Sequence, residues 1–125
     1  MEKKQKCVIL ILEDNTHMRR GIALTLELND FEVYQVSNGY QGIAILKEVI
    51  PDLILSDINM PLMNGLTFYD KVRANPSWTE IPFIFLSGNG AIDKMHNGQY
   101  LAIEEYLQKP ISPKKLIHLI KTKLH

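Results

Sequence analysis

Apolar runs of strand length recur along the chain, and each is followed by a stretch whose apolar residues have helical spacing. The clearest runs cover residues 7–12, 53–56 and 81–86. They are apolar without alternation, which is typical of parallel strands that are covered on both faces. Residues 31–36 predict a second, less buried strand, and residues 104–108, which are more polar, predict a short fifth strand. The pattern therefore predicts five strands.

Five stretches carry apolar residues three or four positions apart, which is the spacing of one helix face. Asn15 or Thr16 can cap the first of these helices. The five stripes are Met18, Ile22 and Leu26; Ile43, Leu46 and Ile50; Leu66, Tyr69 and Val72; Ile92, Met95 and Leu101; and Leu116, Leu119 and Ile120. The fourth stripe predicts a helix over about residues 92–102. It is the weakest of the five by propensity because Asn97-Gly98 lies inside it.

Strands and helices thus alternate along the whole chain. This order favours a parallel sheet with helices on both faces, which is a three-layer α/β domain. No internal repeat, low-complexity segment or linker interrupts the alternation. We therefore expect a single domain over residues 1–125, with a polar N-terminal tail at residues 1–6.

The composition of the chain limits the kinds of partner and the cellular compartment that we expect. The 125 residues include 14 Lys plus Arg and 14 Asp plus Glu, so no net charge draws the domain to nucleic acid or to a membrane surface. No apolar stretch approaches the ~18 residues of a membrane span. The single cysteine, Cys7, excludes an internal disulfide, and we expect it to be buried on the first strand. We expect a soluble cytoplasmic protein.

Polar residues follow the ends of four predicted strands. They are Glu13 and Asp14 after the first strand, Asp57 after the third, Ser87 after the fourth and Lys109 after the fifth. Ligands of an open α/β sheet bind beyond the carboxyl ends of its strands, near the point where the strand order reverses. These five side chains are therefore predicted to share one crevice.

The three carboxylates of this set favour a divalent cation. Carboxylates within several ångströms repel one another, and a cation relieves that repulsion. Hard oxygen donors with water completing the shell suit Mg²⁺ or Mn²⁺. We expect Asp14 and Asp57 as direct ligands and the Asn59 backbone carbonyl as a third. Glu13 could bind directly or through water.

Asp57 is the predicted nucleophile of the crevice. With its charge partly neutralised, its carboxylate can attack a phosphorus centre and become an acyl phosphate. Ser87 and Lys109 would then supply a hydroxyl and a fixed positive charge to the new phosphoryl oxygens.

Taken together, these positions resemble the receiver domains of two-component response regulators, in particular the single-domain chemotaxis type. The matching pieces are Glu13-Asp14, Asp57 followed by Met60-Pro61 and Gly65, Ser87, and Lys109-Pro110. The resemblance covers roughly residues 7–124. It implies a flavodoxin-like fold of strand order 2-1-3-4-5 and a cis peptide bond at Lys109-Pro110.

The resemblance also implies a function. Such a domain depends on Mg²⁺ and accepts a phosphoryl group on Asp57 from the phosphohistidine of a sensor histidine kinase or histidine phosphotransfer protein. It is a switch and not an enzyme, except that it promotes its own phosphorylation and dephosphorylation. Phosphorylation would draw Ser87 toward Asp57, and Tyr106 would move into the vacated space. The face formed by the fourth helix, fifth strand and fifth helix would then bind an output partner.

Three other functions compete with this interpretation. A phosphohydrolase of the haloacid-dehalogenase type also uses a strand-end aspartate, but it needs an acid two residues later, where this chain has Asn59. A flavodoxin needs a phosphate-binding loop after the first strand, where Glu13-Asp14 would repel a phosphate. An unphosphorylated docking module is the third. The chain could be a stand-alone receiver or part of a larger regulator or hybrid kinase, and it could be a monomer or a phosphorylation-dependent dimer.

Overall fold

A five-stranded parallel sheet forms the centre of the protein. The computed structural model describes residues 5–88, 95–96, 99–100 and 106–124. Its sheet has the order β2-β1-β3-β4-β7, which confirms the predicted 2-1-3-4-5 arrangement of the five strands. The strands are β1 (Val8–Leu12), β2 (Glu32–Val36), β3 (Leu53–Asp57), β4 (Phe83–Ser87) and β7 (Tyr106–Gln108). All their pairings are parallel.

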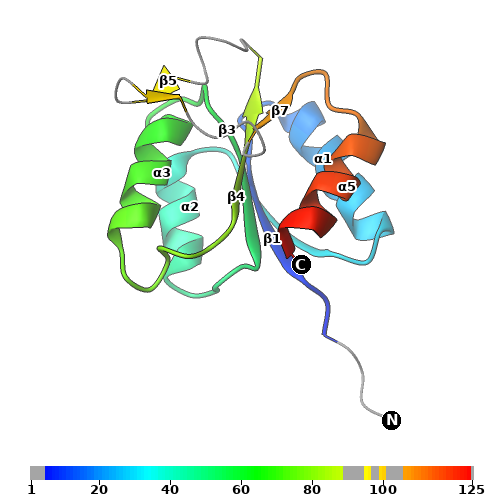
Figure 1. The fold of residues 1–125 in the computed structure, drawn as a ribbon, viewed down its shortest axis with the longest axis horizontal. Helices are drawn as coiled ribbons and strands as arrows, with labels where there is room; N and C mark the ends of the chain where they lie inside the picture. The colour runs from blue at the N-terminus through cyan, green and yellow to red at the C-terminus, as the bar shows by residue number, and fades with distance from the viewer. Residues whose placement is uncertain (1–4, 89–94, 97–98, 101–105, 125) are drawn as a thin grey trace.

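Helices cover both faces of this sheet, as the alternation predicts. They are α1 (Thr16–Leu28), α2 (Gly39–Leu46), α3 (Gly65–Ala74) and α5 (Pro113–Leu124). Helices α2 and α3 lie on one face, and α1 and α5 lie on the other (Figure 1). No helix in the described part of the chain is both long and apolar enough to cross a membrane.

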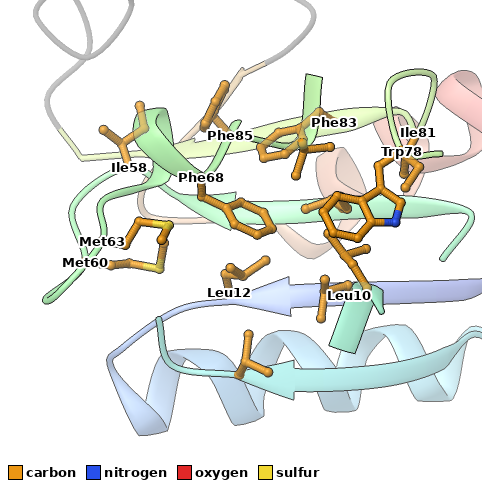
Figure 2. Packing of buried hydrophobic residues seen from close by; sticks show 14 of the residues in the cluster. Leu10, Leu12, Ile58, Met60, Met63, Phe68, Trp78, Ile81, Phe83 and Phe85 are labelled. Carbon is orange, nitrogen blue, oxygen red and sulfur yellow. The ribbon is translucent and has the colours of Figure 1, made fainter. Parts of the chain in front are cut away.

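The core is divided into two layers by the alternation of side chains along each strand. On the α2 and α3 face, Leu10 and Leu12 of β1 pack with Phe68 of α3 and with Phe83 and Phe85 of β4 (Figure 2). On the other face, the alternate strand residues pack with α1 and α5. The central strands β3 and β4 are buried along their whole length, which explains why they read as continuous apolar runs.

Asparagine caps begin three of the helices. The side-chain oxygens of Asn15, Asn38 and Asn64 each accept a hydrogen bond from the backbone N–H three residues later, at 2.9 Å in every case. Each cap satisfies one of the free N–H groups of a first helical turn. The caps at Asn15 and Asn64 also end the loops that follow β1 and β3, beside the acidic strand-end residues, so they help to set the shape of those loops.

The helix predicted over residues 92–102 is wrong where the structure describes that segment. Met95–His96 (β5) pairs antiparallel with Gln99–Tyr100 (β6), and the remainder of the segment lies outside the described residues. The sequence between the two short strands is Asn97-Gly98, the dipeptide that most favours a two-residue hairpin turn. For this segment the turn-forming dipeptide was a better predictor of structure than the thin apolar stripe, which had predicted a helix.

Two smaller predictions also differ from the structure. Helix α2 ends at Leu46, and the side chain of Ile50 is 56% exposed instead of completing an apolar stripe. Pro51 follows Ile50 and disfavours a helical conformation there. Cys7 is exposed and precedes β1, so it is not the buried strand residue that the apolar run suggested.

Gly65 should be the glycine whose replacement by alanine disturbs the fold near the polar crevice. A Cβ there would collide with the backbone carbonyl oxygen of Asp57, whereas a Cβ on Gly21 of α1 would meet nothing within 4 Å. We expect Gly65→Ala to lower the free energy of unfolding by about 1–3 kcal/mol. We expect Gly21→Ala, the matched control, to raise it by about 0.5–1 kcal/mol. Urea unfolding measures both values, and a neutral Gly65→Ala would contradict this account of the loop.

Candidate functional site

Parallel register brings the predicted polar residues to one edge of the sheet. Leu12 of β1 is paired with Ser56 of β3, so the next residues, Glu13 and Asp57, lie beside each other. On the other side of β3, β4 ends at Ser87, which is paired with Gln108 of β7. Lys109 comes directly after that pair, and its backbone N–H donates to the Ser87 carbonyl at 2.8 Å. The structure therefore brings Glu13, Asp14, Asp57, Ser87 and Lys109 together at one edge of the sheet, and we call this cluster the polar crevice.

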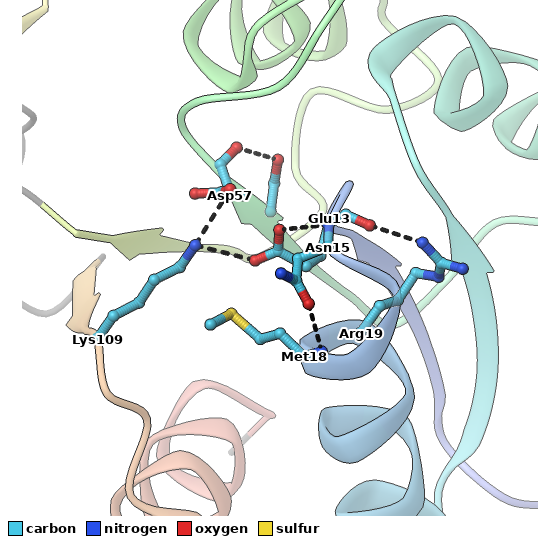
Figure 3. A network of polar contacts seen from close by, with 7 residues as sticks. Glu13, Asn15, Met18, Arg19, Asp57 and Lys109 are labelled. Carbon is cyan, nitrogen blue, oxygen red and sulfur yellow. Dashed lines mark hydrogen bonds and ion pairs between the residues drawn. The ribbon is translucent and has the colours of Figure 1, made fainter.

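Lys109 connects the two buried carboxylates of this crevice. Its Nζ lies 3.0 Å from Glu13 Oε1 and 3.2 Å from Asp57 Oδ2 (Figure 3). Glu13 is 1% exposed and Asp57 is 4% exposed, while the lysine side chain retains 22% exposure. Two carboxylates with so little access to water need a positive partner, because an unpaired buried charge is strongly destabilising. Lys109 is that partner.

The surroundings shift the pKa values of two of these groups. Burial raises the pKa of the Glu13 carboxyl, and the nearby Asp57 carboxylate adds to this effect, while the Asn15 N–H and the Lys109 ammonium partly oppose it. Burial by itself would lower the pKa of Lys109, but the carboxylates of Glu13 and Asp57 outweigh it and leave that pKa raised. Lys109 is therefore a fixed positive charge at neutral pH.

Backbone contacts hold Glu13 in position. Its Oε2 accepts the backbone N–H of Asn15 at 3.1 Å, and its carbonyl oxygen accepts a hydrogen bond from Arg19 Nη1 at 2.9 Å (Figure 3). Sequence analysis did not identify Arg19 as part of the site. An arginine on a helix has many possible partners, and only the fold brings it over the end of β1.

The acidic residues of the crevice could hold a cation. One carboxylate oxygen from each of Glu13, Asp14 and Asp57 lies within 4.8 Å of the others, the closeness that a shared metal ion requires. Glu13 Oε1 is buried, and the Lys109 ammonium at 3.0 Å is its partner. Asp14 is exposed, which leaves room for water in the coordination shell. Such an all-oxygen set fits Mg²⁺ or Mn²⁺.

The remaining predicted residues lie around this cluster. Ser87 is buried at the end of β4, and Asn59 is exposed two residues after β3, so their roles stay predictions. Tyr106 is buried on β7, where its ring stacks on Phe85 with 5.7 Å between ring centroids. The Lys109-Pro110 peptide bond is cis, as the family resemblance implied.

An acidic crevice with one lysine at the carboxyl edge of a 2-1-3-4-5 sheet is the arrangement of a signal-receiving α/β domain. The sequence profile of the response regulator receiver domain matches residues 9–121. The chain therefore belongs to the family of response regulator receiver domains, which act in two-component signalling.

Relatives of known description agree with this family. The phosphate regulon transcriptional regulatory protein PhoB of Pseudomonas aeruginosa is 31% identical over 116 residues, which cover 93% of this chain and 51% of that protein. The probable transcriptional regulator ycf29 of Pyropia yezoensis is 31% identical over 112 residues, covering 90% and 50% respectively. The chain thus spans about half the length of these relatives.

Solved structures share the fold. The chemotaxis response regulator CheY4 of Vibrio cholerae has a TM-score of 0.84 at 25% identity, over 94% of this chain and 98% of that one. The receiver domain of a sensor histidine kinase from Pseudomonas aeruginosa has a TM-score of 0.87 at 24% identity, over 96% and 98%. That second structure is described with a magnesium ion coordinated in its active site cleft.

Replacing Glu13 by glutamine should stabilise the metal-free protein at neutral pH. The raised pKa of Glu13 means that the folded state binds its proton more tightly than the unfolded state does. The free energy of unfolding therefore falls as the pH rises above the ordinary glutamate pKa of about 4.3. In EDTA, we expect Glu13→Gln to unfold at higher urea concentration than wild type at pH 7, and at nearly the same concentration near pH 4.

Glu27→Gln on the exposed side of α1 is the matched control, and we expect it to change stability by less than about 0.5 kcal/mol at either pH. A Glu13→Gln variant that is less stable than wild type at pH 7 would show that the Lys109 ion pair outweighs the effect of burial.

Proposed function

We propose that this chain is a Mg²⁺-dependent phosphoacceptor switch whose acceptor is Asp57. The observation that carries the proposal is the position of Asp57 Oδ2, which is buried beside both a fixed ammonium and two further carboxylates. That surrounding supplies a nucleophile, a cation site and a positive group for the incoming phosphoryl oxygens.

In the proposed reaction, a carboxylate oxygen of Asp57 attacks the phosphorus of a phosphohistidine. A P–O bond forms, the P–N bond breaks, and the electron pair of that bond returns to the imidazole of the donor. Lys109 can stay near Asp57 and pair with a phosphoryl oxygen, because its Nζ already lies 3.2 Å from Oδ2. Ser87, on the neighbouring strand, is the proposed hydroxyl donor to another phosphoryl oxygen.

Glu13, Asp14 and Asp57, with the Asn59 carbonyl, are the proposed holders of the cation. When bound, Mg²⁺ supplies positive charge that neutralises the acidic cluster and the phosphoryl oxygens. Mn²⁺ is expected to substitute, because it takes the same hard oxygen donors. The proposed phosphoryl donor is a sensor histidine kinase or a histidine phosphotransfer protein, and we expect the exchange to occur in the cytoplasm.

Asp57→Asn should abolish phosphorylation. We expect wild-type protein incubated with acetyl phosphate and Mg²⁺ to gain the mass of one phosphoryl group, which intact-protein mass spectrometry detects. Asp57→Asn should gain none, because an amide lacks the nucleophilic oxygen. Mg²⁺ removal by EDTA should abolish labelling of the wild type, and Mn²⁺ should restore it.

Two variants complete this experiment. Asp30→Asn changes an exposed aspartate in the turn after α1 and should label like wild type. Asp14→Asn keeps the acceptor but should require roughly 10- to 100-fold more Mg²⁺, the usual effect of weakening a metal site. Mass gain in Asp57→Asn, or labelling that is equally strong in EDTA, would reject the proposal.

We further propose that Ser87 and Tyr106 carry the signal out of the crevice. Ser87 ends β4, and Tyr106 lies on the paired strand β7 with its ring stacked on Phe85. A shift of Ser87 toward a phosphoryl group would change the space next to the Tyr106 ring. The face proposed to respond comprises the fifth strand of the sheet, β7, and the last helix, α5.

Ser87→Ala should uncouple Tyr106 from Asp57. We expect the phosphoryl mimic beryllofluoride to shift the amide NMR signals of Tyr106 and Leu107 in wild type. The shifts should be largely lost in Ser87→Ala and kept in Ser87→Thr, which retains the hydroxyl. Equal shifts in all three proteins would refute this route while leaving the acceptor role of Asp57 intact.

A further inference from the structure

Helix α2 has an unusually apolar surface. None of its eight residues, Gly39–Leu46, carries a charge, whereas α1, α3 and α5 all contain charged residues. Tyr40 is 61% exposed and Ala44 is also exposed. A surface helix normally carries charged residues on its outer side. The exposed side of α2 instead carries Tyr40, Ala44 and one uncharged polar residue, Gln41, so this helix offers an uncharged, largely apolar surface to a partner.

A groove is lined by residues of α2, by Lys71 of α3 and by residues of the neighbouring loops. Helices α2 and α3 lie on the face of the sheet opposite α1 and α5 (Figure 1). The volume of the groove is about 650 Å³. Its apolar lining comprises Tyr40, Ile43, Ala44, Met63 and Trp78, and its charged lining comprises Lys47, Glu48 and Lys71. Trp78 and Met63 are buried and form the floor of the groove. Tyr40 is exposed on its wall, where a ligand can contact it.

The close approach of α2 to the rest of the protein shapes this groove. A Cβ on Gly39 would come within 2.6 Å of the Met63 sulfur, and a Cβ on Gly42 would come within 2.7 Å of a Leu12 methyl. Side chains at these two positions would push α2 outward. Met63 belongs to the loop that follows Asp57, so the groove adjoins the segment that leads away from the polar crevice.

We propose that this groove binds an acidic amphipathic helix of a partner protein. The apolar side chains of that helix would pack on Tyr40 and Trp78, and its acidic side chains would pair with Lys47 and Lys71. The walls, α2 and α3, have eight and ten residues. They are therefore about 12–15 Å long, which matches two to three turns of a bound helix. This site is separate from the face proposed to respond to phosphorylation, and its occupancy does not require phosphorylation.

The charges of the groove favour this occupant over a second copy of the chain. Two lysines and one glutamate give the lining an excess of positive charge. In a twofold dimer the same patch would meet itself, so the excess positive charges would face each other. An acidic segment relieves that excess. Helix-in-groove recognition is also a recurrent use of an apolar channel between two helices.

Trp78 provides a direct assay, because it is the only tryptophan in the sequence and it lines the groove. The probes are two synthetic helical peptides with the same leucine stripe, one flanked by glutamates and the other by lysines. We expect the glutamate peptide to change Trp78 emission and to bind at least about fivefold more tightly than the lysine peptide at low salt. That ratio corresponds to two exposed ion pairs and should shrink as salt is added.

Variants of exposed residues complete the test. Tyr40→Ala should weaken both peptides, and Lys47→Gln with Lys71→Gln should remove the preference for the glutamate peptide. Glu48→Gln, the matched control of opposite charge, should strengthen that preference. Asp57→Asn should bind like wild type, which separates this site from the phosphoacceptor function. Circular dichroism checks that each variant is folded.

Three results would overturn the proposal. The first is equal affinity for the two peptides, which would mean a groove without charge selectivity. The second is peptide binding that Tyr40→Ala leaves unchanged. The third is a sedimentation experiment in which the free protein dimerises and Tyr40→Ala makes it monomeric, because a second copy would then be the occupant.

Discussion

The contact of the Lys109 ammonium with two buried carboxylates is the interaction on which the polar crevice depends. Glu13 directly follows β1 and Asp57 is the last residue of β3, and both side chains are almost without access to water. Like charges in that setting would repel, and each would carry a desolvation penalty. Lys109 joins them from a third strand, at 3.0 and 3.2 Å. One side chain thus links the ends of β1, β3 and β7.

The charged residues of the crevice lie at the end of a sheet whose remaining core is mostly apolar and stabilising. The central strands are largely apolar on both faces. In one layer Ser56 lies between Leu12 and Phe85, and its buried hydroxyl donates a hydrogen bond to the Asp57 carbonyl oxygen at 2.9 Å. The charges appear only where the strands end. The raised pKa of Glu13 indicates that its ionised form is disfavoured by its surroundings, so the crevice holds charge at a cost in stability. That cost is understandable if the site exists to gather a cation and a phosphoryl group.

The same loop that begins at Asp57 serves both proposed sites. Gly65 lies against the Asp57 carbonyl, and Met63 lies against the start of α2. The phosphoacceptor crevice and the groove between α2 and α3 are therefore neighbours along one short segment, although their chemistry differs. The crevice is acidic and is proposed to hold a cation, whereas the groove is apolar with excess positive charge and is proposed to bind an acidic helix.

Much of this protein is determined locally by its sequence. Continuous apolar runs specify buried parallel strands. Asp57 can be placed at the end of a strand from the sequence alone because the apolar run before it is short and uniform. The segment at residues 92–102 shows the limit of this reasoning. Its apolar stripe is thin, and Asn97-Gly98 favours a turn, so the described pairs of residues form short strands instead of a helix.

Only the tertiary structure decides which polar groups meet. Sequence position places Lys109 after a strand, but the parallel register puts its ammonium between Glu13 and Asp57. The packing of α1 also brings Arg19 to the Glu13 carbonyl oxygen, a contact that no local sequence pattern predicts. The physical reason is that periodicity reports which side of an element is buried, whereas long-range contacts depend on how separate elements pack. The sequence by itself determined most of the elements and the residues able to react, and packing decided their partners.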